Sequence, residues 1–400
     1  MPDKLVADQF LLRGGSVLDT ATGGSARSDV GVRDGLVVDP GDLTDARDID
    51  ATGLTVMWGL WDSHAHPGSL MYDPSAEGYF EGVAARTIRA GINLQEAASM
   101  GVTGVRAVGD GSGVDLAWAK SLRTGEASGP RLIAAGRSVR TTGGHGTAYP
   151  RRYVDVETGI IADGPVEMRR AVRTLVEQGA EWIKILITGG LYSEHESVAG
   201  KQFDDSELKA ALAAAHDRGV PVAAHCGSAR LAEQFANLGG RSVEHGYALD
   251  EAAAATMAER GTWLIPTIGV THDRQMMIDT GWPPHAAERA VESAAGHAES
   301  LRICLAAGVR IATGADLNPI GPRLHRELEL LHEVGMTLQQ VLYAATTSAR
   351  ALVGLGELSA PGPGGVADLI LLDEDPMQGL ATLRKPRGVM TFGRFVIEPS

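Results

Sequence analysis

The chain has 400 residues, of which 44% are hydrophobic, enough to build the core of one barrel-sized domain or of a barrel with a smaller companion. Its 36 lysines and arginines are outnumbered by 50 aspartates and glutamates, which gives a formal net charge of −14. This charge argues against nucleic acid or an anionic membrane surface as a partner, because both attract basic proteins.

The lack of a recognisable targeting signal and the small number of cysteines predict a cytoplasmic protein. The start, Met1–Leu5, lacks the basic and apolar regions of a secretory signal. No apolar stretch approaches the roughly 20 residues that a membrane span needs. The two cysteines, Cys226 and Cys304, are too few for a disulfide framework and suit a reducing compartment.

Short strand-like runs separated by turns occupy both ends of the chain. In the first 55 residues, the pair Asp34-Gly35 between two apolar runs predicts a β-hairpin. Near the other end, 367–373 and 389–397 are also strand-like. Because neither end can bury a core alone, we predict that 1–55 and 355–400 pair into one small β-sandwich domain.

The middle of the chain, residues 56–354, repeats an apolar β-rich run, a break and an alanine-rich helical stretch. Parallel strands alternating with helices predict an α/β fold, a (β/α)₈ TIM barrel. No Gly-x-Gly-x-x-Gly follows a strand, which lowers the dinucleotide-binding alternative. The eight predicted strands are 54–60, 104–108, 131–135, 182–187, 221–224, 242–244, 262–265 and 309–312. The predicted helices include 166–178, 205–218, 250–260 and 324–334.

A pair of histidines, His64 and His66, follows the first predicted strand. Side chains at i and i+2 of a strand share one face, and imidazole is a common zinc ligand. By itself the pair is weak evidence, because the chain contains 12 histidines. The pair becomes informative only if further ligands follow at later strand ends.

Such residues do follow. Lys184 lies inside an apolar strand, where an unpaired ammonium would be costly to bury. His225 and His245 end the fifth and sixth predicted strands, and Asp316 follows the eighth. Barrel active sites are built at the carboxyl ends of the strands, so these side chains are expected at one site.

The ordered set resembles the amidohydrolase superfamily in its binuclear-metal form. The segments 325–331, 344–350 and 367–369 are similar to the imidazolonepropionase-like branch that includes Xaa-Pro and Xaa-Arg dipeptidases. The resemblance covers essentially the whole chain. The residues that carry it, in chain order, are His64, His66, Lys184, His225, His245 and Asp316.

The resemblance implies two divalent ions, with zinc as the first candidate and manganese or cobalt left open by the ligand types. Lys184 would be carboxylated by CO₂ to a carbamate that bridges the ions. A metal-bridging hydroxide would attack an amide carbonyl, with Asp316 as general base and then general acid. One ion would be held by His64, His66 and Asp316, and the other by His225 and His245.

Substrate contacts are expected from the loops. His145, in a glycine-rich loop, is a candidate catalytic donor to the substrate carbonyl or its oxyanion, as in the family. Dipeptidase relatives often carry a tyrosine shortly after the fifth-strand histidine to hold the substrate carboxylate, whereas here Cys226, Gly227 and Ser228 follow it. Further candidates for substrate binding are Arg140, Tyr192, His195, Arg230 and Asn318.

The leading hypothesis is a metal-dependent hydrolase of an amide or peptide C–N bond in a small peptide or peptide-like substrate, which includes modified natural products. One alternative is a cyclic-amide hydrolase or deaminase that acts on a heterocycle. A second is a non-catalytic barrel scaffold. The resemblance is also compatible with a homo-oligomer.

Overall fold

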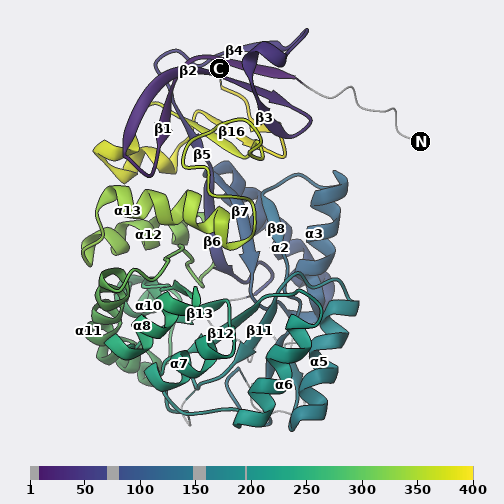
Figure 1. Cartoon of the computed structure of the whole chain (residues 1–400), viewed down its shortest axis with the longest axis vertical. Coiled ribbons are helices and arrows are strands. Elements are labelled where there is room, and N and C mark those ends of the chain that lie inside the picture. Colours follow the sequence, from purple (N-terminus) through teal and green to yellow (C-terminus); the bar gives the residue numbers. More distant parts are fainter. Residues whose placement is uncertain (1–8, 70–80, 147–158, 194–195, 400) are drawn as a thin grey trace.

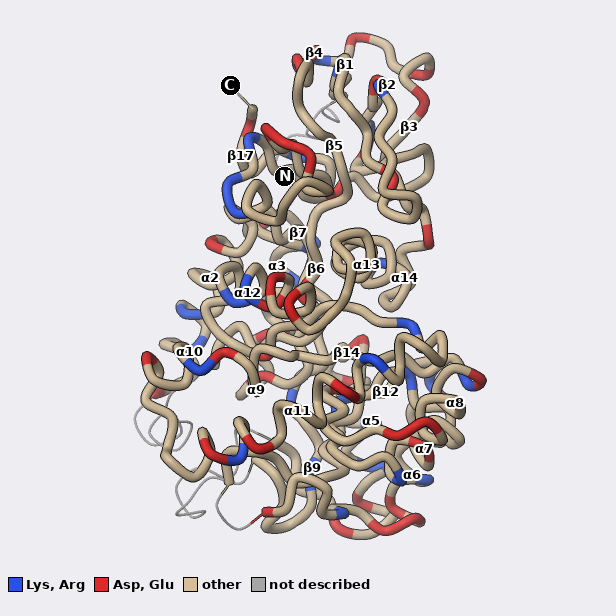
Figure 2. Tube along the Cα trace, turned by 90° about the vertical axis from the view of Figure 1, so that its left-hand side faces the viewer, with Lys and Arg blue, Asp and Glu red and all other residues tan. Residues whose placement is uncertain are grey.

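The structure is a computed structural model that describes residues 9–69, 81–146, 159–193 and 196–399. Strands from both ends of the chain gather at one end of the molecule, and alternating strands and helices form the rest (Figure 1). Acidic and basic residues lie close together along the helices of that larger part (Figure 2). No helix of the described residues combines the length and the apolar character that crossing a membrane requires.

The terminal strands form one eight-stranded sheet, in the order β17-β16-β15-β5-β1-β2-β3, with β4 paired to β1. This confirms that both chain ends share a sheet. Asp34 and Gly35 both have positive φ angles and connect β2 to β3, which confirms the predicted hairpin. The strands are β1 (Phe10–Asp19), β2 (Gly24–Arg33), β3 (Leu36–Val38), β4 (Arg47–Asp50), β5 (Thr55–Trp58), β15 (Leu369–Leu372), β16 (Gly388–Thr391) and β17 (Arg394–Ile397).

The first predicted barrel strand is wrong, because the segment divides at Gly59. Residues before it form β5, which pairs with the terminal strands β1 and β15, and residues after it form β6 (Leu60–Ala65), which pairs with β7. A β-carbon at Gly59 would lie 2.1 Å from Thr103 Oγ1, so the chain passes too close to its neighbour for any side chain. His64 therefore lies within a strand, and only His66 follows it.

The remaining parallel strands form two sheets, β6-β7-β8 and β10-β9-β11-β12-β13-β14. Six of the predicted strands are confirmed, but 309–312 is not a strand and makes a single bridge, Ile311 to Leu264. Ser63 N donates to Thr313 O at 2.8 Å, which joins that segment to β6. The strands are β7 (Val102–Ala107), β8 (Arg131–Ile133), β9 (Ser138–Arg140), β10 (Gly159–Ile161), β11 (Ile183–Leu186), β12 (Val222–Cys226), β13 (Ser242–His245) and β14 (Trp263–Ile265).

Helices flank these parallel strands (Figure 1). The four predicted helices are confirmed as α5, α6, α8 and α12, and α6 begins at a capping box formed by Asp204 and Glu207. The helices are α2 (Val83–Ser99), α3 (Val114–Thr124), α5 (Pro165–Glu177), α6 (Asp205–His216), α7 (Ala229–Asn237), α8 (Glu251–Arg260), α9 (Gly269–His272), α10 (Arg274–Asp279), α11 (Pro284–Ala306), α12 (Ile320–Glu333), α13 (Leu338–Tyr343) and α14 (Ala349–Leu352).

Candidate metal centre and active site

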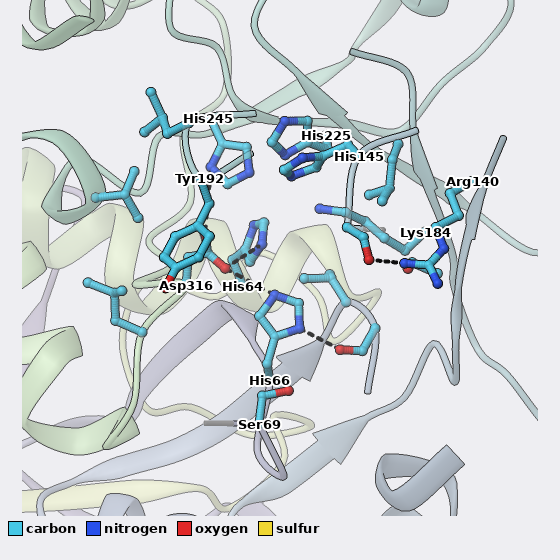
Figure 3. A pocket seen from close by; sticks show the side chains of 18 of the residues that line it. His64, His66, Ser69, Arg140, His145, Lys184, Tyr192, His225, His245 and Asp316 are labelled. Atoms are coloured by element: carbon cyan, nitrogen blue, oxygen red, sulfur yellow. Dashed lines mark hydrogen bonds and ion pairs between the residues drawn. The ribbon is translucent and has the colours of Figure 1, made fainter. Parts of the chain in front are cut away.

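A cavity of about 310 Å³ opens where the parallel strands end (Figure 3). β6, β11, β12 and β13 each deliver a polar side chain to it, and the segment after Ile311 delivers a carboxylate. All six residues predicted as metal ligands line this cavity: His64, His66, Lys184, His225, His245 and Asp316.

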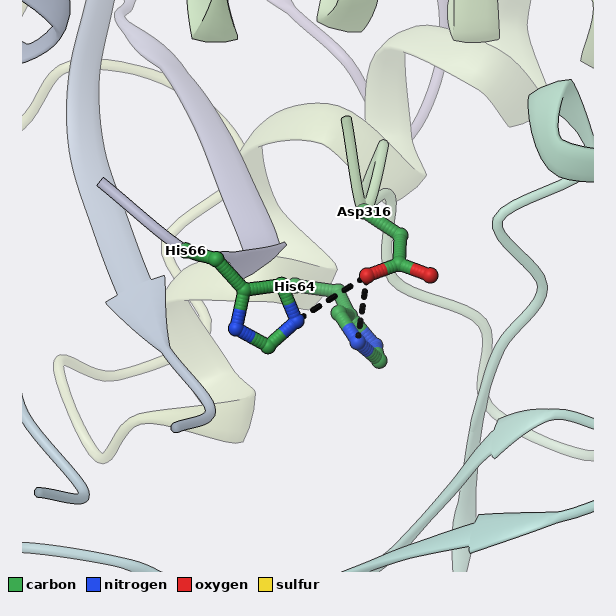
Figure 4. A group of neighbouring side chains, drawn as sticks. All are labelled: His64, His66 and Asp316. Carbon is green, nitrogen blue, oxygen red and sulfur yellow. Dashed lines mark ion pairs between the residues drawn. The ribbon is translucent and has the colours of Figure 1, made fainter. Parts of the chain in front are cut away.

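Three of these side chains converge closely enough to hold one cation (Figure 4). Asp316 Oδ1 lies 3.2 Å from His64 Nε2 and 3.0 Å from His66 Nε2. Burial opposes ionisation of Asp316, but its interactions with His64 and His66 hold the pKa of this carboxyl well below its usual range. The cluster therefore offers an anionic oxygen and two imidazole nitrogens, a donor set suited to a divalent metal.

A buried ion-pair network fixes the tautomer of His64. His64 Nδ1 donates to Glu244 Oε2 at 2.7 Å, which leaves Nε2 as the lone-pair nitrogen toward Asp316. Glu244 is in turn bound by Arg106 Nη2 at 2.9 Å, and all three side chains are buried. Despite burial, the Arg106 charge holds the pKa of Glu244 far below its usual range, so the carboxylate is ionised. A carboxylate behind a metal-ligating histidine orients the ring and increases its basicity.

The other three histidines are oriented in the same way. His66 Nδ1 donates to the carbonyl of Gly109, and His225 Nε2 donates to the carbonyl of Gly189 at 3.0 Å. His245 Nδ1 lies 2.7 Å from Thr267 Oγ1. Burial lowers the pKa of both His225 and His245 well below the ordinary value, so both rings are neutral. Neutral rings with one nitrogen tied to the protein keep the other available for a cation.

Lys184 contributes a buried amine to the site. Its side chain is buried, and no hydrogen bond or ion pair joins its ammonium to another described residue. Burial lowers the pKa of Lys184 to about 8, although the charges of Glu244 and Asp316 oppose this shift. This lowered pKa increases the neutral fraction of the amine, the form that attacks CO₂ as a nucleophile.

Backbone contacts place Asp316 against β6. Asp316 N donates to His64 O at 2.8 Å, and the residue adopts a positive φ of 60°. Asp62 accepts from the backbone N–H groups of His64 at 3.0 Å and of Ala315 at 3.1 Å. The carboxyl of Asp62 thus ties the strand that carries the histidines to the turn that carries the carboxylate.

Residues 55–396 match the model of the amidohydrolase family, and this match includes every residue that lines the cavity. The chain belongs to the amidohydrolase family. It is a hydrolase that acts on C–N bonds.

Individual relatives of this amidohydrolase agree with that assignment. This chain is 29% identical to ochratoxinase from Aspergillus niger, over 84% of this chain and 73% of the relative. It is 29% identical to imidazolonepropionase from Methylobacterium nodulans over 86% and 87% of the two chains. The crystal structure of a prolidase complexed with N-methylphosphonate-L-proline is 29% identical, with a TM-score of 0.88 over 98% of this chain and 100% of that one.

The predicted substrate contacts of the amidohydrolase divide into two groups. Arg140, His145 and Tyr192 line the cavity, whereas Asn318 does not. Asn318 Nδ2 instead donates to the carbonyls of His66 at 2.8 Å and Ser69 at 2.7 Å, so this side chain holds the loop after β6. His195 lies outside the described residues, and Arg230 is on α7 away from the cavity lining.

His145 is held in place by two contacts. Its Nδ1 lies 2.9 Å from Glu196 Oε2, and its ring centroid is 4.2 Å from that of His225. Arg140, at the end of β9, donates to the carbonyl of Gly146 in the same loop. The loop that carries His145 is thereby fixed beside the metal-site histidines, on the same side of the cavity as Arg140 (Figure 3).

Sequence reasoning missed three residues of the amidohydrolase site: Arg106, Glu244 and Tyr247. Arg106 and Glu244 are charged residues within fully buried strands, so the argument about the cost of a buried charge that singled out Lys184 applies to them as well. Tyr247 stacks on His245, with ring centroids 5.1 Å apart, and burial raises the pKa of its phenol well above the ordinary value. Nothing in the local pattern around Tyr247 indicated this position.

Proposed function

We propose that this amidohydrolase cleaves an amide or peptide C–N bond in a small peptide or peptide-like substrate, using two divalent metal ions. The observation that carries the proposal is the convergence of Asp316 Oδ1 on the Nε2 atoms of His64 and His66, next to a buried Lys184 that has no bonded partner among the described residues. The names of the relatives, which include ochratoxinase and prolidase, support the amide or peptide class.

The donor set fits two ions better than one. His64, His66 and Asp316 would hold the first, and His225 and His245 would hold the second. Carboxylation of Lys184 joins its neutral amine to CO₂ with loss of a proton, which removes a buried ammonium and supplies oxygen ligands between the two groups. Four imidazoles with oxygen donors suit zinc first, and manganese or cobalt after it. Bound divalent ions would supply Lewis acidity and lower the pKa of water.

The protein's own groups handle the proton. Asp316 Oδ1 contacts the rings of His64 and His66, while Oδ2 points away from both rings (Figure 4). Oδ2 is therefore the oxygen that takes the proton of the attacking water and later delivers it to the leaving nitrogen. His145, held by Glu196 at the cavity, is placed to donate a hydrogen bond to the oxyanion that develops on the carbonyl.

The proposal extends to the architecture that supports the site. The two parallel sheets would close into a (β/α)₈ barrel that begins at β6 and ends at residue 354; it begins later than the predicted residue 56 because β5 pairs with the terminal strands. The terminal segments, together with β5, would pack as a β-sandwich. The bond from Ser63 N to Thr313 O supports closure on the β6 side. Closure would bring all six ligands to one rim of the barrel.

Asp316→Asn tests the reaction. We expect the metal-loaded variant to keep at least one ion, because the amide oxygen still coordinates, and to lose amide hydrolysis by about 10²- to 10⁴-fold, because Oδ2 can no longer take a proton. Metal content is measured by mass spectrometry, and turnover is measured with dipeptides, N-acyl amino acids and ring amides. The ring amides separate peptide cleavage from the heterocycle alternative that imidazolonepropionase similarity suggests.

The matched control is Asp217→Asn, at an exposed carboxylate next to the end of α6. It should leave both turnover and metal content unchanged. A fully active Asp316→Asn, or a wild-type protein that retains fewer than about one divalent ion per chain after metal-supplemented expression, would refute the proposal.

A further inference from the structure

One wall of the cavity is apolar and aromatic, in contrast to the side that carries Arg140 and His145. It joins a cluster of buried side chains that extends to Met276 and Met277 of α10. A wall of this kind accommodates a bulky apolar part of a substrate. Its residues are Leu191, Tyr192, Tyr247, Val270, Trp282 and Leu317.

Tyr247 is the most tightly held residue of this wall. Its ring lies parallel to that of His245, at an interplanar angle of 7°, and meets His297 edge-on at 5.0 Å. A β-carbon at Gly227 would lie 3.1 Å from Tyr247 Cδ2, so the ring uses the space that a side chain at 227 would need. Packing on these sides fixes where the phenol points.

The hydroxyl of Tyr247 has no partner among the described residues. The residue is 4% exposed and lines the cavity, and within the described part of the chain its hydroxyl makes no hydrogen bond. Buried hydroxyls are normally bonded, and an unpaired one costs free energy. The phenolic O–H of Tyr247 can donate a hydrogen bond, so an acceptor oxygen of a ligand in the cavity fits this position.

We propose that Tyr247 is a specificity residue that donates its hydroxyl to an oxygen of the substrate next to the scissile amide. Resting on the proposed function, this defines the substrate class as amides of an apolar amino acid, in which the acceptor is the free carboxylate or the carbonyl of the next peptide unit. The apolar side chain packs on the wall of Tyr192 and Trp282, whose rings meet edge-on at 5.8 Å. A rigid single donor in an apolar wall discriminates strongly against analogues that lack the acceptor.

Tyr247→Phe tests this inference, because phenylalanine keeps the ring and its stacking but removes the donor. Binding is measured on the metal-loaded Asp316→Asn enzyme, with and without Tyr247→Phe, by calorimetry. The probes are N-benzoyl-L-phenylalanine, its carboxamide, and N-benzoyl-2-phenylethylamine, which lacks the acceptor. We expect Tyr247→Phe to weaken binding of N-benzoyl-L-phenylalanine by about 10- to 100-fold and to leave the phenylethylamine compound within about twofold.

The carboxamide identifies the source of the acceptor. If Tyr247→Phe weakens binding of the carboxamide as much as binding of the acid, the Tyr247 hydroxyl donates to a neutral carbonyl. If only binding of the acid is weakened, the hydroxyl donates to a carboxylate. Both results support the inference. Equal effects of Tyr247→Phe on all three probes, or no binding of any of them, would overturn it. Failure of the proposed function is distinct, because it would appear as an active Asp316→Asn enzyme.

Two controls accompany these measurements. Tyr343→Phe, on α13 and outside the cavity lining, should change none of the three affinities. Metal content of Tyr247→Phe should equal that of the parent, since the ring that stacks on His245 is retained. A binding loss accompanied by loss of metal would assign Tyr247 a structural role and overturn the inference.

Discussion

Arg106 and Lys184 are two buried cations of the same site with opposite surroundings. Every nitrogen of the Arg106 guanidinium has an acceptor: Nε donates to Ser63 O at 2.6 Å, Nη1 to Ser242 Oγ at 2.9 Å, and Nη2 to Glu244. Lys184 has no such bond among the described residues, and its amine faces the cavity. A satisfied buried cation supports structure, whereas an unsatisfied one that is retained next to ligands points to chemistry.

Replacing each cation by methionine tests whether the two cations have separate roles, and it has the largest expected effect. Lys184→Met should lose metal and reduce amide hydrolysis on the order of 10³-fold, because the ligand between the two histidine groups is gone. Its free energy of unfolding should stay the same or rise without added metal, since an unpaired buried ammonium has been removed. Metal analysis, turnover and urea unfolding measure these effects.

Arg106→Met is the matched control. It leaves Glu244 ionised and buried without its cation, so we expect the free energy of unfolding to fall by about 3–5 kcal/mol. If Lys184→Met kept its metal and turnover, or lost as much stability as Arg106→Met, the two cations would not have separate roles.

A smaller effect is expected from replacing the carboxylate of Glu244. Glu244→Gln keeps an acceptor for His64 Nδ1–H but removes the negative charge behind the ring, so metal affinity should fall by about 10- to 100-fold. Competition with a coloured chelator measures this affinity. Ser242→Ala, which removes only a hydroxyl of the same network, is the control and should change affinity less. Unchanged affinity in Glu244→Gln would mean that the charge does not tune the ligand.

A third buried titratable group, His297, sharpens the comparison through the pH dependence of stability. Burial lowers the pKa of His297 from 6.5 to about 3, and the ring bonds to Thr271 and to the carbonyl of His245. The unfolded chain gains this proton near pH 6.5 and the folded chain only near pH 3. The contribution to stability is therefore complete above pH 6.5 and is lost as the pH falls toward 3, by about 1.4 kcal/mol per pH unit.

His297→Gln should remove that part of the pH dependence. Urea unfolding at several pH values below 6.5 should show a slope smaller by about one proton. His216→Gln, at an exposed histidine of α6, should leave the slope nearly unchanged. An unaltered slope in His297→Gln would show that the folded ring already carries a proton.

The candidate ligands were accessible from the sequence because few residue types bind metals and strand ends are recognisable by pattern. Five residues were selected by position near strand ends, and Lys184 was selected as a charge inside an apolar strand; the family resemblance assigned all six as ligands. The five are His64, His66, His225, His245 and Asp316, and together with Lys184 they line one cavity. The same pattern placed six strands and four helices correctly. It failed at Gly59, where a close approach to Thr103 divides one apolar run between two sheets, and at 309–312, where neighbours provide only one bridge.

The partners of those ligands depended on the tertiary structure. The hydrogen bond from His64 to Glu244, for example, joins residues 180 positions apart in the sequence. Local hydrophobic periodicity cannot predict a contact between residues so far apart. The same holds for Asn318, whose amide donates to the backbone of His66 and Ser69. It also holds for Tyr247, which lines the cavity while its ring stacks on His245 and meets His297 edge-on.

The sequence by itself therefore determined which chemical groups are present and in what order the strands deliver them, because residue type and strand period are local properties. Only the tertiary structure decided which ring nitrogen faces the cation, which buried charge is satisfied and which hydroxyl is left for a substrate. Those properties depend on the directions of side chains from different strands, which are set when the core packs.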